Sequence, residues 1–151
     1  MNITEKIQEL KQNRIVLIEK LSHLNTQQFN EIPLKYTNNI IWNLGHMLVT
    51  PIYHLYSGAE KMPPNIHNLY KKYLKDTKPN TRTGSLEIEE ILNLMIPTLE
   101  RLEEDFHAGV FSHDQGFALS AFERGFDFLI FHENIHINTI MGILKAMGSG
   151  R

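Results

Sequence analysis

The sequence predicts an all-α fold, a four-helix bundle that forms a single domain over residues 1–151. Apolar residues recur at alternating spacings of four and three in four separate segments, and this is the period of an amphipathic helix. No segment of note alternates with the period of two that a half-buried strand needs. The length fits one domain with a sizeable hydrophobic core. We therefore expect a helical protein that needs no disulfide or structural metal for stability.

The first predicted helix covers residues 3–23. Asn2 and Glu5 have the spacing of an N-cap and its capping-box partner, so they mark its start. Arg14 lies on the apolar seam and places a charged side chain at a core-type position. The polar residues 25–28 end the pattern. The other members of the seam are Ile3, Ile7, Leu10, Leu17, Leu21 and Leu24.

The second predicted helix covers residues 36–56 and contains Pro51, which removes one backbone donor and predicts a kink near Thr50. Residues 59–84 follow, with several prolines and an excess of lysine and arginine. A connection of this length is unusual inside a compact domain. We interpret it as a basic crossover along the bundle, with one short helix at 66–74.

The third predicted helix begins at Ser85 or two residues earlier and runs to Phe106. Pro97 lies off its apolar seam, so only a local bend is expected there. Residues 107–118 contain two histidines and two glycines and predict a loop. The fourth helix covers residues 119–147. The crossover therefore separates the second and third helices of the bundle.

The composition excludes several classes of function. A net charge of −2 argues against binding nucleic acid over a broad surface. The absence of cysteine excludes a catalytic thiolate, an iron–sulfur cluster and a thiolate zinc site. No apolar run approaches 18 residues, and the N-terminus opens directly into an amphipathic pattern, so neither a membrane span nor a secretory signal is predicted. A cytoplasmic protein is expected.

The fourth predicted helix carries the strongest functional signal, because its seam is not wholly apolar. Glu133 and His136 occupy core-type positions, and His132 stands beside them. Two histidines four residues apart project from one face of a helix and are able to bind one cation. The simpler interpretation is that these are core histidines that hydrogen-bond to one another or to Glu133. Burying unpaired polar groups is costly, so partners, water or a metal must be present.

A third ligand should come from a facing helix, and His46 in the second helix is the candidate. Its helix face combines apolar and hydrogen-bonding side chains, as a cleft wall does. Three histidines leave at least one open position on a metal, which is typical of catalytic sites. Glu133 is then either a general base or an acceptor for an imidazole N–H.

Residues 132–136 also match the H-E-x-x-H pattern of zinc proteases. A small helical bundle offers no strand that would hold a peptide substrate. No further ligand motif follows the fourth helix. We therefore do not favour a protease function for this chain.

Taken together, these motifs resemble the DinB/YfiT-like superfamily of small bacterial bundles over nearly the whole chain. The resemblance rests on Trp42 four residues before His46, on the irregular crossover that ends at residues 81–86, and on the final pair His132 and His136. It implies an up-down-down-up bundle, a metal triad of the three histidines and a homodimer. Known activities of the superfamily are mainly transfers that involve low-molecular-weight thiols. The family often has Arg-Gly-Gln after the second histidine, whereas this chain has Ile-Asn-Thr at 137–139.

The favoured hypothesis is a cytoplasmic metal-dependent enzyme that acts on a small-molecule substrate. Zn or Ni is the metal most expected, with Fe or Mn as alternatives. Transfer of a low-molecular-weight thiol to an electrophile and hydrolysis are both compatible with such a site. The rival hypotheses are a non-catalytic metal-binding or stress-related dimeric bundle, and a metal-free dimer whose triad is a relic.

Overall fold

The computed structural model describes residues 2–56, 63–111 and 115–149, and every regular element in these ranges is a helix. Side chains within the last range are described for residues 123–148. The predicted all-α class is confirmed. In chain order the helices are α1 (Ile3–Leu21), α2 (Thr26–Asn30), α3 (Ile40–Leu55), α4 (Pro64–Tyr73), α5 (Ser85–Leu94), α6 (Pro97–His107) and α7 (Gln115–Ser149).

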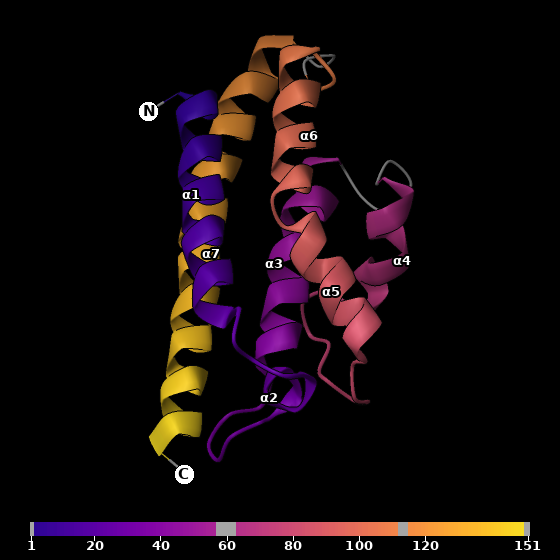
Figure 1. Cartoon of the computed structure of the whole chain (residues 1–151). Coiled ribbons are helices and arrows are strands. Elements are labelled where there is room, and N and C mark those ends of the chain that lie inside the picture. The colour runs from indigo at the N-terminus through magenta and orange to yellow at the C-terminus, as the bar shows by residue number, and fades with distance from the viewer. Residues whose placement is uncertain (1, 57–62, 112–114, 150–151) are drawn as a thin grey trace.

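The central element is α3, which packs against α4 on one side and α7 on the other (Figure 1). Every residue of α3 from Ile40 to Ile52 is buried. A helix that is buried all round must be enclosed by neighbours, and α5 and α2 also contact it. Figure 1 shows that α1 and α7 lie side by side and run in the same direction, while α3, α5 and α6 run in the opposite direction.

The first helix begins as predicted, because the Asn2 side chain accepts a hydrogen bond from the Glu5 backbone and Glu5 returns one to the Asn2 N–H. Arg14 is buried on its seam, with 1 % of its surface exposed. The prediction missed α2. Its signal was present, because Asn25 and Gln28 form a second capping box at the spacing of the first.

The predicted third helix is wrong in one respect, because it is two helices. α5 ends at Leu94 and α6 begins at Pro97, which takes the first-turn position where a missing N–H is tolerated. Leu99 donates its backbone N–H to Ile96 instead of Met95. The proline therefore interrupts the helical hydrogen bonding where the sequence predicted only a bend.

The other boundaries moved by a few residues. α3 begins at Ile40, four residues later than predicted, because the Asn39 side chain caps it by accepting from the Trp42 N–H. α3 then runs through Pro51 to Leu55. In the predicted crossover the short helix is found as α4, and in the predicted loop at 107–118 α7 already begins at Gln115.

Candidate metal centre

The three predicted histidines come together between α3 and α7. One ring nitrogen from each of His46, His132 and His136 lies within 4.8 Å of the others, and Nε2 of His46 is 3.0 Å from Nε2 of His132. His46 is 4 % exposed, and the two histidines of α7 are partly exposed. The site is therefore closed on the α3 side and accessible beside α7.

The ring orientation of His46 is set by backbone. Its Nδ1 lies 2.7 Å from the carbonyl oxygen of Tyr73, at the C-terminal end of α4. A carbonyl oxygen only accepts, so Nδ1 carries the hydrogen and Nε2 presents its lone pair to the other histidines. Trp42 stacks on the same imidazole, with ring centroids 4.7 Å apart, and its indole N–H donates to Thr77.

The ring orientation of His136 is set by Asn43. The Asn43 side-chain nitrogen donates to the Asn38 side chain and to the Asn39 carbonyl, which leaves its oxygen as the acceptor. Nδ1 of His136 lies 2.8 Å from that oxygen and donates to it. Nε2 of His136 is thereby also left with a free lone pair. Asn43 lies on the same mixed face of the second predicted helix as His46, but nothing in the sequence indicated its bond to His136.

Burial keeps all three imidazoles neutral at pH 7. Burial above all, with the nearby His46 as a smaller cause, lowers the pKa of His132 to about 4 and that of His136 to about 3. The pKa of His46 is also lowered, by burial above all, against the opposing effect of its bond to the Tyr73 carbonyl. Neutral imidazoles are the form that binds metals.

These residues fit a divalent transition metal. Two histidines donate Nδ1–H to fixed acceptors, which is the usual arrangement around a metal-binding histidine because it orients the ring and fixes its tautomer. A zinc ion with ligands at about 2.0–2.1 Å separates neighbouring donor atoms by roughly 3.3 Å. Nε2 of His46 and Nε2 of His132 are 3.0 Å apart, and one ring nitrogen of each of the three histidines lies within 4.8 Å of the others, so a small movement of the side chains would bring them around one ion. An all-imidazole set is compatible with Zn, Ni, Fe and Cu.

Glu133 does not join the histidines. It is 2 % exposed, and its two carboxylate oxygens accept from Nε and Nη2 of Arg14 at 2.5 and 3.0 Å. The pair is buried between α1 and α7, so two of the polar seam positions in the sequence, Arg14 and Glu133, satisfy each other. The sequence contained both residues but nothing in it indicated that they meet.

The other described histidines lie apart from the centre. The exposed histidines among them are His23, His54, His67 and His107. His107 hydrogen-bonds to Thr4 at the N-terminal end of α1. His54 shares the helix of His46 but is two turns further along. His113 lies outside the described residues. The other four described histidines are therefore surface residues.

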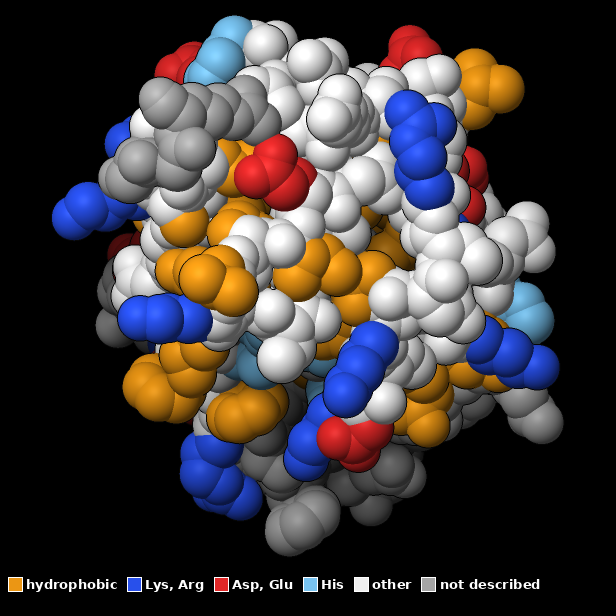
Figure 2. All heavy atoms as spheres, turned by 90° about the horizontal axis from the view of Figure 1, so that it is seen from below, with side chains coloured by type: hydrophobic (Ala, Val, Ile, Leu, Met, Phe, Trp, Pro, Cys, Tyr) orange, Lys and Arg blue, Asp and Glu red, His pale blue; other side chains and the backbone are white. Residues whose placement is uncertain are grey.

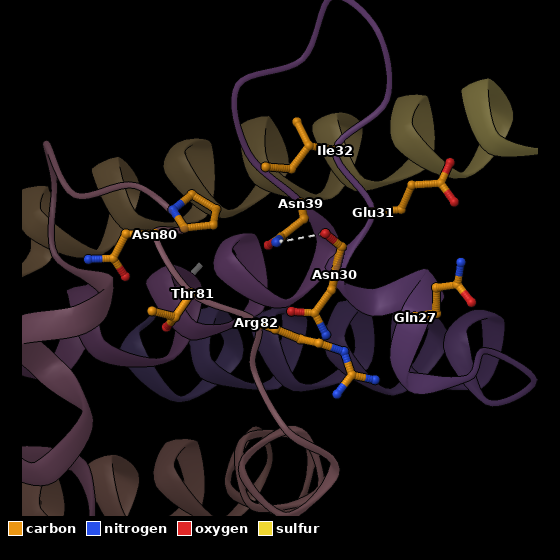
Figure 3. A pocket seen from close by; sticks show the side chains of 9 residues that line it. Gln27, Asn30, Glu31, Ile32, Asn39, Asn80, Thr81 and Arg82 are labelled. Atoms are coloured by element: carbon orange, nitrogen blue, oxygen red, sulfur yellow. Dashed lines mark hydrogen bonds between the residues drawn. The ribbon is translucent and has the colours of Figure 1, made fainter.

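A polar hollow of about 440 Å³ lies beside the start of α3 (Figure 3). Its lining comes from α2, the N-cap of α3 and the segment before α5, namely Gln27, Asn30, Glu31, Ile32, Asn39, Pro79, Asn80, Thr81 and Arg82. Asn39 donates to the Asn30 carbonyl and its own carbonyl accepts from Asn43, the partner of His136. One wall of the hollow is thus joined to a histidine of the centre by hydrogen bonds.

This end of the molecule carries a mixed surface. Figure 2 shows histidine side chains set back between hydrophobic and basic side chains on the face seen from below. The three histidines lie between α3 and α7. The hollow of Figure 3 instead draws its lining from α2, Asn39 and residues 79–82. Among the described residues, no helix has both the length and the apolar character needed to cross a membrane.

Comparison with known proteins agrees with this arrangement. Residues 9–140 match the DinB superfamily, and this range includes all three histidines. Neither the curated proteins nor the solved structures contain a significant match to the chain. The family match covers most of the 151 residues, and the chain therefore belongs to the DinB superfamily.

Proposed function

We propose that this protein is a cytoplasmic metal-dependent enzyme in which His46, His132 and His136 hold a divalent metal ion. The observation that carries the proposal is the outward hydrogen bonding of His46 and His136, which leaves the Nε2 lone pair of each ring available in a cluster where Nε2 of His46 is 3.0 Å from Nε2 of His132. Histidines that merely satisfied one another in a core would not need two separate acceptors to fix their tautomers. Zn or Ni is the expected metal, with Fe or Mn as alternatives.

The proposed reaction is transfer of a low-molecular-weight thiol to an electrophilic small molecule, or hydrolysis. A divalent metal at this site would supply Lewis acidity, which lowers the pKa of water or of a thiol toward neutral pH. The chain has no cysteine, so a thiol would have to be a cosubstrate. The chain's own residues orient the imidazoles through Tyr73 and Asn43 and shield one side of the centre with Trp42.

Glu133 was expected to be either a general base or an acceptor for an imidazole N–H, and its surroundings support a different role. A base must reach the proton that it removes. The carboxylate of Glu133 is buried and engaged by Arg14 on both oxygens. We therefore favour a structural role for Glu133 near the centre. Replacement by glutamine separates the two roles, because loss of a base abolishes turnover without weakening metal binding.

The proposal includes the up-down-down-up four-helix topology and a homodimer. The helix directions in Figure 1 support the topology when α1, α3, the α5–α6 pair and α7 are taken as the four members. The dimer is supported by exposed apolar side chains on α1 and α7, namely Ile15, Val16, Phe128, Phe131 and Ile135. Sedimentation velocity of the wild type and of Phe131→Glu tests it. A dimer that becomes a monomer is expected, and a wild-type monomer would contradict it.

A second candidate is a metal-binding bundle without catalysis. One observation favours it: the lining of the polar hollow contains none of the three histidines, so that hollow does not open directly on the proposed ligands. The two candidates differ in whether a substrate reaches the metal. They share the prediction that metal binds.

The first experiment is elemental mass spectrometry of untagged protein purified without chelator, with His46→Ala and His132→Ala beside it and His23→Ala as the matched control. We expect near-stoichiometric metal in the wild type and in the control, and loss of metal in both site variants. Absence of metal, with no uptake of added Zn²⁺ or Ni²⁺, would overturn the proposal. Thiol-transfer and hydrolase assays with the metal found then separate the enzyme from the non-catalytic bundle.

A further inference from the structure

Arg14 makes an unusual set of bonds for a residue on a helix that supplies no histidine to the centre. It is 1 % exposed. Its Nε and Nη2 donate to the Glu133 carboxylate on α7, its Nη2 also donates to the Met47 carbonyl on α3 at 2.9 Å, and its Nη1 donates to the Met95 carbonyl at 2.8 Å. One side chain of α1 therefore joins α3, α7 and the junction between α5 and α6.

Both carbonyl groups lack their usual helical hydrogen-bond donor, and in each case a proline is the reason. In α3 the Met47 carbonyl would normally accept from the N–H of residue 51, and Pro51 has none. At the α5–α6 junction the Met95 carbonyl would accept from Leu99, but Leu99 donates to Ile96 where Pro97 restarts the helix. Buried carbonyls without partners are costly. Arg14 satisfies both, and so the prolines and the arginine depend on each other.

The residues that Arg14 binds on α3 and α7 are next to the proposed ligands in the sequence. Met47 directly follows His46, and Glu133 lies between His132 and His136 in the same turn of α7. The planar guanidinium binds the carboxylate through two bonds, which restricts direction as well as distance. Arg14 thus holds α3 and α7 in register at the level where their histidines meet.

We infer that Arg14, acting through Glu133, is a positioning residue that sets how α3 and α7 present the three histidines. The inference rests on the proposed function for its metal measurement, but it also makes a prediction for the metal-free protein. Fold stability alone does not require such a pair, because a buried ion pair is often replaceable by apolar residues of similar size without loss of stability. The specific role of the pair is geometric.

The test compares the double variant Arg14→Met/Glu133→Leu with Lys6→Met/Asp127→Leu. The control removes an ion pair of 2.7 Å between the same two helices, away from the histidines. The first measurement is nitrogen-15 NMR of the imidazoles without metal, which reports the tautomer of each histidine. The second is calorimetric titration with Zn²⁺ alone. Thermal unfolding is recorded for each variant.

In the wild type and the control we expect His46 and His136 as single Nδ1–H tautomers. In the double variant we expect mixed tautomers and at least a tenfold loss of Zn²⁺ affinity in a protein that still folds. Its melting temperature should be lower than that of the control, because the Met47 and Met95 carbonyls lose their donor. Wild-type tautomers and affinity in a folded double variant would overturn the inference. If the double variant does not fold, the same measurements on Arg14→Lys decide, because lysine keeps the charge but lacks the planar fork.

The two proposals fail in different ways. If the wild type contains no metal and takes up neither Zn²⁺ nor Ni²⁺, the proposed function fails, and the NMR comparison still decides whether Arg14 orients the imidazoles. If the wild type binds Zn²⁺ and the double variant binds it equally well, the proposed function stands and the positioning role is refuted.

Discussion

His46 donates its Nδ1 hydrogen to the backbone carbonyl of Tyr73 at 2.7 Å, and this bond connects the central helix α3 to the end of α4. The approach is possible because residue 45 is glycine. A Cβ at Gly45 would overlap the Tyr73 ring. The Tyr73 hydroxyl in turn donates to Glu87 on α5, which also binds Lys72. The orientation of a proposed ligand thus depends on how closely α4 packs on α3.

Gly45→Ala should therefore weaken both stability and metal binding. The added methyl group forces α4 away from α3, and overpacking of this kind costs about 1–3 kcal/mol. The Tyr73 carbonyl moves with α4, so His46 loses its fixed tautomer. Gly125→Ala on α7 is the control, since a Cβ there meets no other atom and alanine favours a helix. Urea unfolding and Zn²⁺ titration measure the two effects, and equal behaviour of the two variants would contradict the packing argument.

Asn43→Ala should weaken metal binding with the fold retained. It removes the acceptor for the Nδ1–H of His136. Loss of such a partner typically costs 10–100-fold in metal affinity. Asn68→Ala, at an exposed position on α4, should leave affinity unchanged. The readout is competition against a zinc indicator. Wild-type affinity in Asn43→Ala would show that His136 is oriented without it.

The metal-free protein should lose stability as the pH falls below about 6.5. The pKa of His132 is lowered to about 4 and that of His136 to about 3, whereas an unfolded histidine titrates near 6.5. Between these values the unfolded chain binds more protons than the folded one, so acid favours unfolding, by at most about 1.4 kcal/mol per pH unit for each histidine. Above pH 6.5 both states are neutral at these sites and the effect vanishes.

Urea midpoints at pH 7.5 and pH 5.0 measure this dependence. His132→Gln/His136→Gln removes both groups and should flatten the pH profile, whereas His67→Gln on the surface of α4 should preserve it. A profile that keeps its slope in the double variant would assign the acid sensitivity to other groups.

Arg14→Met alone should destabilise the protein strongly, by about 3–5 kcal/mol, because Glu133 would remain buried without its partner. Arg14→Met/Glu133→Leu should recover part of that loss, since no buried charge remains unpaired, although the Met47 and Met95 carbonyls still lack a donor. Denaturant unfolding of both variants gives the coupling between the residues. Additive losses in the double variant would mean that the carboxylate and the guanidinium do not depend on each other.

Several features of the fold were accessible from the sequence because they are local. The capping box of Asn2 and Glu5 marked the start of α1, and the alternating apolar spacing identified the helical segments. Two further features are equally local but were not predicted: a second capping box at Asn25 and Gln28 defines α2, and Pro97 divides α5 from α6. Both depend only on residues close together in the sequence.

The site divides in the same way. Spacing and polarity indicated His132 and His136. The mixed helix face of His46 made it the candidate for a third ligand, which the family resemblance also implied, and the structure brings the three together. The residues that orient these histidines could not be identified from the sequence. Tyr73 contributes a backbone carbonyl, which every residue has, and its selection depends on the packing of α4 against Gly45. Glu133 looked like a member of the site because of its neighbours in sequence, whereas its partner Arg14 is 119 residues away.

The sequence by itself determined the helical class, the positions of the histidines on their helices and the absence of a protein thiol, because these follow from periodicity, spacing and composition. Only the tertiary structure decided which polar residues pair. The carbonyls of Met47 and Met95 have no helical donor because of two prolines, and they accept hydrogen bonds from the guanidinium of Arg14. The same guanidinium also binds Glu133. Pairings of this kind depend on how helices that are distant in sequence pack in three dimensions. No local sequence pattern encodes how such helices are placed relative to one another.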